Sequence, residues 1–176
     1  MLGRLGFPLS FVDVEVEEKV PESLPAEQVA EVLACMKADG YTGKLSQDQV
    51  LVTADTVVVL GSHVLGKPHN RVEAVDTLEQ LSGQVHQVYT GVCLRSADSK
   101  VAFTERTDVH FRQLNENEIN YYIDRYKPFD KAGAYGIQEW IGMVGIERIE
   151  GCYYNVMGLP VARLYHELVP LMAKKV

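Results

Sequence analysis

The fold of this chain is decided by an apolar, β-branched run at residues 50–60, with the sequence VLVTADTVVVL. Valine and threonine favour strands because their branched side chains pack well on a pleated surface. The run ends at Gly61-Ser62, a hairpin turn signal, and residues 63–65 are predicted to return beside it. We therefore expect a buried strand with a short hairpin partner.

Helical and extended patterns alternate on both sides of this run. Apolar residues that recur every three or four positions predict helices at residues 25–39, 71–81, 115–126 and 160–168. Further strands are predicted at residues 7–16, 84–95, 101–114 and 143–149. This order predicts an α/β (mixed α+β) fold, in which one domain spanning residues 1–176 is built on one twisted sheet.

The composition argues against several classes of protein. Seventeen Lys and Arg against 24 Asp and Glu give a net charge of −7, and 47% of the residues are hydrophobic. Such a chain is not disordered, and it lacks the basic face that a nucleic acid polymer requires. No apolar run approaches the roughly 20 residues of a membrane span. Three cysteines without C-x-x-C spacing, Cys35, Cys93 and Cys152, indicate free thiols and a cytoplasmic location.

Asp55 is the only ionisable residue between Val50 and Leu60. A carboxylate in a buried strand destabilises the fold unless it is paired, hydrogen-bonded or bound to a cation. Two interpretations remain open at this point. Asp55 is either a functional carboxylate, or a strand-end residue that caps a helix or pairs with a structural arginine.

Two lysines also stand out. Lys37 lies beside the apolar stripe of the 25–39 helix and in its last turn, where a cation suits the helix dipole. A snorkelling lysine at a helix end is the simpler interpretation. Lys67 lies between Gly66 and Pro68, which fix the backbone on both sides and would aim its side chain, although a solvated turn lysine is the common case.

A glycine-containing segment at residues 130–138, DKAGAYGIQ, is either a backbone nest for an anion or an ordinary loop, because turns commonly contain glycine. With the acidic stretch at residues 15–18, these features suit the binding of a metal-bound polyphosphate. The histidines lack zinc-ligand spacing, so carboxylates are the expected ligands, of Mg²⁺ or Mn²⁺. Neither a Walker motif, nor G-x-G-x-x-G, nor G-x-S-x-G is present, so the sequence does not support P-loop, Rossmann or acyl-transfer assignments.

At these residues the sequence resembles the Maf family of nucleoside triphosphate pyrophosphatases. The matching segments occur in family order and cover nearly the whole chain. They are VEVEE at residues 14–18, KA at 37–38, TADTVVVL at 53–60, LGKP at 65–68, LSG at 81–83, YTGV at 89–92, DKAGAYGIQ at 130–138 and NVMGLP at 155–160.

The resemblance implies hydrolysis of a nucleoside triphosphate between its α- and β-phosphates, in a central cleft of a two-lobed fold. By the match, Asp55 is the general base that activates water. Lys37 and Lys67 bind phosphate oxygens, and Glu18 with Asp55 holds a divalent metal cation, Mg²⁺ or Mn²⁺. A metal, lysines and a carboxylate that orients water are the groups this chemistry needs.

The resemblance also implies a choice of base. Thr56 and Gln138 follow the dTTP/UTP branch of the family and differ from the 7-methyl-GTP branch. A glutamine amide offers both a donor and an acceptor to the edge of a pyrimidine. The expected partner is thus a nucleoside triphosphate, with neither a nucleic acid polymer nor a membrane, and a homodimer is compatible with the family.

One family feature is missing. Members open with a strand and a turn bearing S-x-S-P-R-R, whose arginines would contact the triphosphate, and this chain starts MLGRLGF. We therefore expect an N-terminally incomplete family domain. Two functions stay open: an enzyme that removes dTTP, UTP or modified pyrimidine triphosphates in nucleotide-pool housekeeping, and a non-catalytic nucleotide-binding protein.

Overall fold

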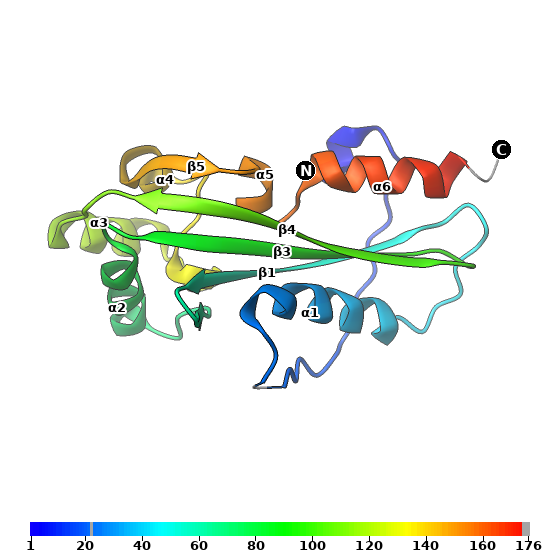
Figure 1. Ribbon diagram of the computed structural model, residues 1–176, viewed down its shortest axis with the longest axis horizontal. Helices are drawn as coiled ribbons and strands as arrows, with labels where there is room; N and C mark the ends of the chain where they lie inside the picture. The colour runs from blue at the N-terminus through cyan, green and yellow to red at the C-terminus, as the bar shows by residue number, and fades with distance from the viewer. Residues whose placement is uncertain (22, 174–176) are drawn as a thin grey trace. The chain divides into compact units, whose positions relative to one another are not determined.

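The computed structural model describes residues 1–21 and 23–173 and has mixed α/β structure (Figure 1). The predicted fold class is confirmed. In chain order, the described elements are η1 (Leu2–Leu5), α1 (Ala26–Gly40), β1 (Leu51–Leu60), β2 (His63–Leu65), α2 (Arg71–Leu81), β3 (Val85–Arg95), β4 (Lys100–Phe111), α3 (Glu116–Tyr126), η2 (Ala132–Ala134), α4 (Trp140–Gly145), β5 (Ile146–Glu150), α5 (Tyr153–Val156) and α6 (Val161–Ala173).

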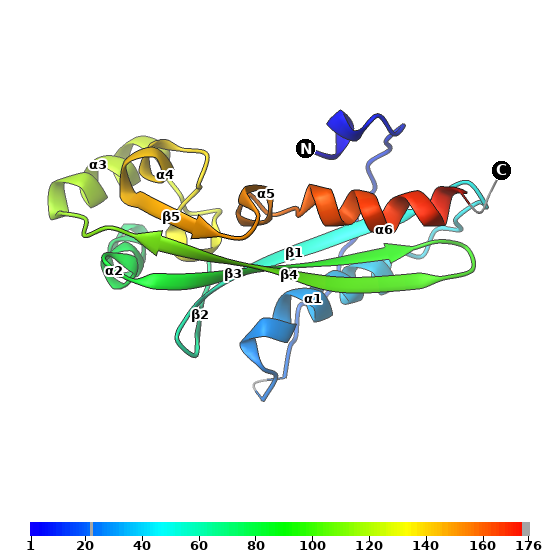
Figure 2. The same ribbon diagram turned by 45° about the horizontal axis from the view of Figure 1, so that its top comes forward.

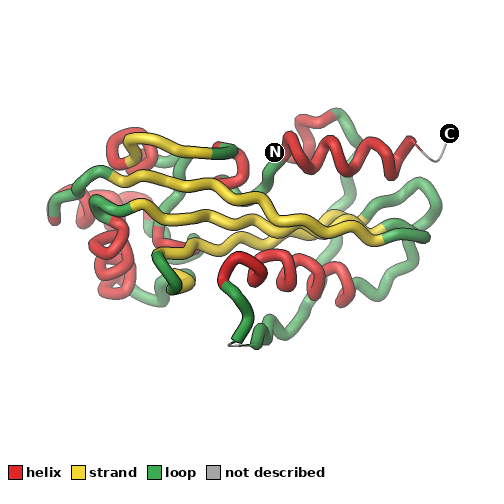
Figure 3. Tube along the Cα trace, in the orientation of Figure 1, coloured by secondary structure: helices red, strands yellow, loops and turns green. Residues whose placement is uncertain are grey.

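Within the described residues, five strands form one sheet in the order β2-β1-β3-β4-β5 (Figure 3). The predicted hairpin is confirmed, because β1 pairs antiparallel with β2 and Leu60 lies opposite His63. β4 pairs antiparallel with β5, with an irregularity in register between His110 and Phe111. Two residues of the Gly61-Ser62 turn are enough to reverse the chain here, and Gly61 has the positive φ of 61° that such a turn requires.

The described residues divide into two compact units. Unit 1 comprises Met1–Asp55, Thr90–Glu105 and the chain from Gly158 onward, and unit 2 comprises Thr56–Tyr89 and Arg106–Met157. The long strands β1, β3 and β4 each contribute residues to both units.

In unit 1, helices α1 and α6 cover opposite faces of the strands, as Figure 2 shows. Neighbouring residues of a strand point to opposite faces, so Cys93 of β3 faces α1 while Val92 and Leu94 face α6. The α1 cluster contains Ala34, Ala38, Leu51 and Cys93. The α6 cluster contains Val92, Leu94, Phe103, Leu164 and Leu168.

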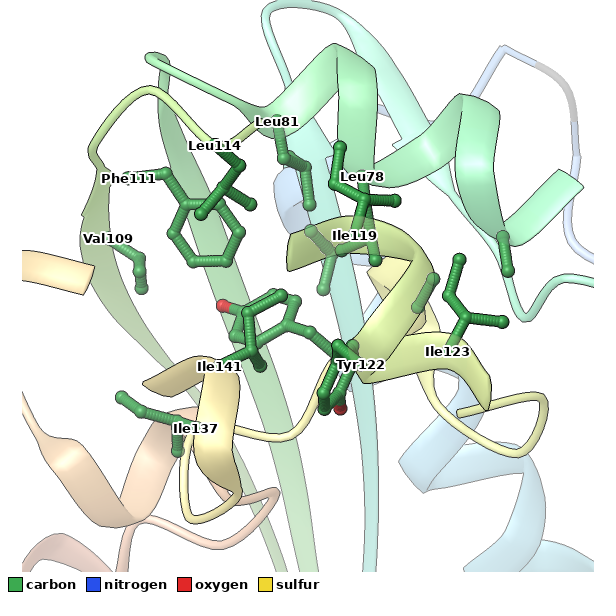
Figure 4. Close-up of a cluster of buried hydrophobic side chains, with 14 of the residues drawn as sticks. Leu78, Leu81, Val109, Phe111, Leu114, Ile119, Tyr122, Ile123, Ile137 and Ile141 are labelled. Carbon is green, nitrogen blue, oxygen red and sulfur yellow. The ribbon is translucent and has the colours of Figure 1, made fainter. Parts of the chain in front are cut away.

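In unit 2, one larger cluster packs α2, α3 and α4 against the strands (Figure 4). Leu78, Tyr122 and Ile123 have no exposed surface. The two long helices begin where the sequence provides caps. Asn70 accepts a hydrogen bond from the backbone N–H of Glu73, and Asn115 forms a complete capping box with Glu118.

Two sequence predictions of secondary structure are wrong. Residues 7–16, predicted as a strand, form neither strand nor helix, and Phe11 is 96% exposed. Residues 140–145 form the short helix α4, so the last strand begins only at Ile146. Among residues 1–21 and 23–173, no helix combines the length and the hydrophobicity that crossing a membrane requires.

Candidate active site

Asp55 lies on β1 and faces helix α1, as the alternation along this strand dictates. Leu51 packs in the α1 cluster, and the hydroxyl of Thr53 donates a hydrogen bond to the backbone oxygen of Ala34 in α1 at 2.7 Å. Strand residues two apart share a face. Asp55 is therefore the next side chain directed toward the helix.

Lys37 meets Asp55 from the helix. It lies three residues after Ala34, so it is on the same side of α1 one turn further along. Its Nζ donates a hydrogen bond to Oδ1 of Asp55 and lies 3.0 Å from Oε1 of Glu18. The structure thus brings together Glu18, Lys37 and Asp55 within unit 1.

Glu18 reaches Lys37 because the preceding segment packs along the end of α1. Val14 and Val16 cover Gly40, and a side chain at Gly40 would overlap Val16. Glu18 follows Val16 by two residues and lies beside the preceding turn of the helix. A segment that packs against a helix in this way does not need a strand neighbour, which is the physical reason for the failed strand prediction at residues 7–16.

The two carboxylates keep Lys37 charged. Partial burial lowers the pKa of Lys37, but the hydrogen bonds and charges of Asp55 and Glu18 outweigh it, and the pKa lies above its ordinary value. The side chains of Lys37 and Asp55 are only 26% and 18% exposed, whereas Glu18 is 48% exposed. The group is therefore a half-buried ammonium between two carboxylates, and one of these carboxylates opens to solvent.

The carboxylates of Glu18 and Asp55 fit a divalent cation that needs only one or two protein ligands. Across the described residues, no three His, Cys, Asp or Glu side chains gather into a metal-binding group. Mg²⁺, however, commonly takes one or two protein carboxylates and completes its shell with water and substrate phosphates. Glu18 and Asp55 both direct an oxygen toward the same point, at Lys37 Nζ, and their hard oxygen ligands suit Mg²⁺ or Mn²⁺.

The remaining predicted residues lie in unit 2. Lys67 is exposed in the turn after β2, and the preceding Gly66 accepts a hydrogen bond from the backbone N–H of Gly133 at 3.1 Å. Gln138 is exposed, and Thr56 is half-buried at the start of the unit 2 part of β1. The structure therefore joins the Lys67 turn to the segment at residues 130–138.

Three of the N–H groups that could contribute to an anion nest in this segment already have partners within the protein. Gly133 and Ala134 do adopt left-handed backbone, with φ of 69° and 57°. Their N–H groups, however, donate to the carbonyl oxygens of Gly66 and Lys131, and the N–H of Gly136 donates to the hydroxyl of Tyr122. These three donors therefore hold the loop in place and are not available to an anion.

Sequence analysis missed the side chains that hold this segment. The hydroxyl of Tyr122 on α3 contacts Glu139, and the hydroxyl of Tyr135 lies 2.8 Å from Nε2 of His86 on β3. Tyr122 belongs to the predicted apolar stripe of its helix, where a tyrosine normally signifies only packing. The usable signal is that a buried tyrosine needs a polar partner for its hydroxyl.

Comparison with known proteins decides the family. A sequence model described as Maf-like protein matches residues 1–171. The chain belongs to the Maf family. A protein of Phocaeicola vulgatus named dTTP/UTP pyrophosphatase is 51% identical over 156 residues, which cover 89% of this chain and 81% of the relative. A protein of the same name from Porphyromonas gingivalis is 49% identical over 170 residues, covering 91% of this chain and 85% of the relative. The Maf resemblance is thereby confirmed.

Proposed function

We propose that this Maf protein hydrolyses nucleoside triphosphates, dTTP and UTP in particular, to the monophosphate and pyrophosphate. The observation that carries the proposal is the contact of Asp55 with Lys37, beside Glu18, in a chain about half identical to proteins named dTTP/UTP pyrophosphatase. A carboxylate on a strand, a cation on a helix and an acidic neighbour beside them suit the activation of water next to a phosphate.

Asp55 acts in this proposal as the general base. Water forms a new bond to phosphorus, the bond between the α- and β-phosphates breaks, and the water proton passes to the Asp55 carboxylate. One Asp55 oxygen accepts from Lys37, and in this proposal the other orients the water. An ammonium has three donors. Two N–H donors of Lys37 are directed to Asp55 and Glu18, so the third can donate to a phosphate oxygen. We also assign phosphate binding to Lys67.

A divalent cation, Mg²⁺ or Mn²⁺, would be held by Glu18 and Asp55. When bound it would supply positive charge that offsets the charge developing on the phosphates. Lys37 already forms ion pairs with both carboxylates in the described structure. Lys37 would therefore share these carboxylates with a bound metal. Part of the positive charge of Lys37 would then be available to the substrate.

Base selection is proposed for Gln138 and Thr56. A glutamine amide can donate to and accept from the edge of thymine or uracil, and a base with another pattern leaves those groups unpaired. The check is pyrophosphate release from dTTP, UTP, GTP and 7-methyl-GTP. A clear preference for 7-methyl-GTP would contradict the base assignment while leaving the reaction itself intact.

A cytoplasmic location is part of the proposal. Its support is that Cys35, Cys93 and Cys152 are all free thiols, which a reducing compartment preserves.

The test of the reaction is Asp55→Asn, compared with Asp39→Asn as a matched control. Both replace an aspartate that pairs with a lysine, but Asp39 lies at the end of α1, is 61% exposed and contacts Lys100. We expect Asp55→Asn to abolish pyrophosphate release, because an amide cannot accept the water proton, and Asp39→Asn to retain it. Near-normal release by Asp55→Asn, or dTTP binding without any release by the unmodified protein, would overturn the proposal.

A further inference from the structure

The hydroxyl of Tyr122 bridges two points of the segment that carries Gln138. Tyr122 lies on α3 and has no exposed surface. Its hydroxyl accepts a hydrogen bond from the backbone N–H of Gly136 at 3.0 Å and donates one to a carboxylate oxygen of Glu139. Gln138 lies between these two contact points in the sequence. Figure 4 shows Tyr122 extending from α3 into the same cluster as Ile137 and Ile141.

The contact with Glu139 is stable at neutral pH. Burial and the hydrogen bond to Glu139 raise the pKa of Tyr122 far above its ordinary value, so the phenol stays protonated and remains a donor. Glu139 is only 19% exposed and lies 3.4 Å from Nζ of Lys131, which keeps a counter-charge beside it. The backbone N–H of Glu139 also donates to the oxygen of Gly136 at 3.0 Å. These bonds close a small ring around residues 136–139.

The rest of the segment is held equally firmly, but from other elements. Tyr135 is bound by His86 of β3, and Gly133 is bound by Gly66 of the Lys67 turn. Ala134 is fully buried with a φ of 57°, a left-handed conformation that a non-glycine residue adopts only when its surroundings impose it. Such over-determined backbone is typical of segments that must present a side chain in one orientation.

We propose that Tyr122 is a positioning residue for base recognition, acting through Glu139 and Gly136 to fix the orientation of Gln138. This inference rests on the proposed function, in which Gln138 contacts the base. Without the hydroxyl, the Gly136 N–H and the Glu139 carboxylate both lose a partner, and an exposed glutamine beside them would sample more orientations. At metal sites, loss of an outer partner that orients a ligating side chain typically lowers affinity or activity by about 10- to 100-fold, and we take the lower end of this range as a guide for Gln138.

The test is Tyr122→Phe, with Tyr126→Phe as the matched control. Tyr126 stands on the same helix, stacked on Tyr122 at 5.2 Å between ring centroids. Both variants keep the ring and lose one hydroxyl. We expect Tyr122→Phe to raise KM for dTTP about tenfold, with kcat and the KM for GTP nearly unchanged. Tyr126→Phe should leave the ratio of the two KM values as it is.

Two variants of Glu139 separate positioning from general loosening. Glu139→Gln keeps an oxygen that accepts from Tyr122 and should retain the base preference, whereas Glu139→Leu should reproduce the loss seen in Tyr122→Phe. If Tyr122 had only a structural role, its loss would raise the KM for dTTP and the KM for GTP in parallel. The positioning role is overturned if Tyr122→Phe or, should that variant fail to fold, Glu139→Leu changes the dTTP-to-GTP ratio less than twofold.

A binding measurement keeps this inference distinct from the reaction. Dissociation constants for α,β-methylene analogues of dTTP and GTP, which cannot be hydrolysed at that bond, report base preference without turnover. If the unmodified protein binds the dTTP analogue selectively but releases no pyrophosphate, the reaction is refuted, and the variants still decide the role of Tyr122. If the unmodified protein shows no base preference at all, the base assignment of Gln138 and the positioning role of Tyr122 both fail, whereas the proposed reaction is unaffected.

Discussion

Lowering the pH from 7 to 5 should destabilise the protein through His86. This side chain has no exposed surface, and its Nε2 lies 2.8 Å from the hydroxyl of Tyr135. Burial first, and the nearby His110 second, lower the pKa of His86 to about 4, against a small opposing effect of Asp108. The unfolded chain would titrate it near the ordinary value of about 6.5.

The sign and size of the effect follow from these two values. Between pH 6.5 and 4 the unfolded state binds a proton that the folded state does not, so the free energy of unfolding falls as the pH falls. At pH 5, about 1.5 units below the unfolded value, the loss is about 2 kcal/mol at 1.36 kcal/mol per unit. The protein should therefore lose a sizeable part of a typical domain stability of about 5–15 kcal/mol before its carboxylates titrate.

The assay is urea unfolding at pH 7 and pH 5 on the unmodified protein, His86→Gln and His63→Gln. Glutamine at position 86 can still bond to Tyr135 but does not titrate, so this variant should lose about 2 kcal/mol less between the two pH values. His63 is exposed on β2, and its variant should show the same pH dependence as the unmodified protein. Equal losses for His86→Gln and the unmodified protein would refute the argument.

Three further predictions concern the site and its helix. Lys37→Met should lower kcat/KM for dTTP by roughly 100-fold, since a half-buried cation proposed to donate to the phosphates is lost. The control is Lys100→Met, which removes a cation paired with Asp39 of the same helix, and equal effects of the two variants would contradict the assignment. Excess EDTA should abolish pyrophosphate release, and Mg²⁺ or Mn²⁺ but not Zn²⁺ should restore it; full activity in EDTA would refute a metal requirement. Cys93 should resist iodoacetamide at pH 8 in the folded protein, because burial and the neighbouring Cys35 raise its pKa to about 12. Alkylation of Cys93 in the folded protein, detected by mass spectrometry, would contradict this prediction.

Most helices and strands could be predicted because their signals are local. The bounds of α2 agree with the prediction at both ends, since Asn70 caps its start and its apolar stripe ends at Leu81. The failures depend on distant partners. In the segment predicted as a strand at residues 7–16, Val14 and Val16 pack against Gly40 of α1 and the segment does not pair in the sheet. Helix α4 has only six residues, too few to show a helical period.

The candidate site was predictable in its members but not in all its contacts. Asp55 stands out because a lone carboxylate in an apolar strand needs a partner, and that partner is Lys37, which the sequence singled out independently. Tyr122 and Glu139 gave no such signal. Each looks ordinary in its own segment, and their importance comes from a hydrogen bond between α3 and a loop 17 residues later in the chain.

One face of β1 shows how the fold builds the proposed catalytic group. Along this face, Leu51 contributes apolar packing, Thr53 bonds to the helix backbone at 2.7 Å, and Asp55 meets Lys37. The contacts of Leu51 and Thr53 hold α1 against the strand. The pair of Asp55 and Lys37 is therefore positioned by neighbouring residues that take no part in the chemistry. A carboxylate and an ammonium held by rigid elements need little reorganisation when a substrate arrives, which is what electrostatic stabilisation of developing charge requires. The same alternation that makes residues 50–60 a strand therefore also directs Asp55 toward Lys37, as its proposed role as general base requires.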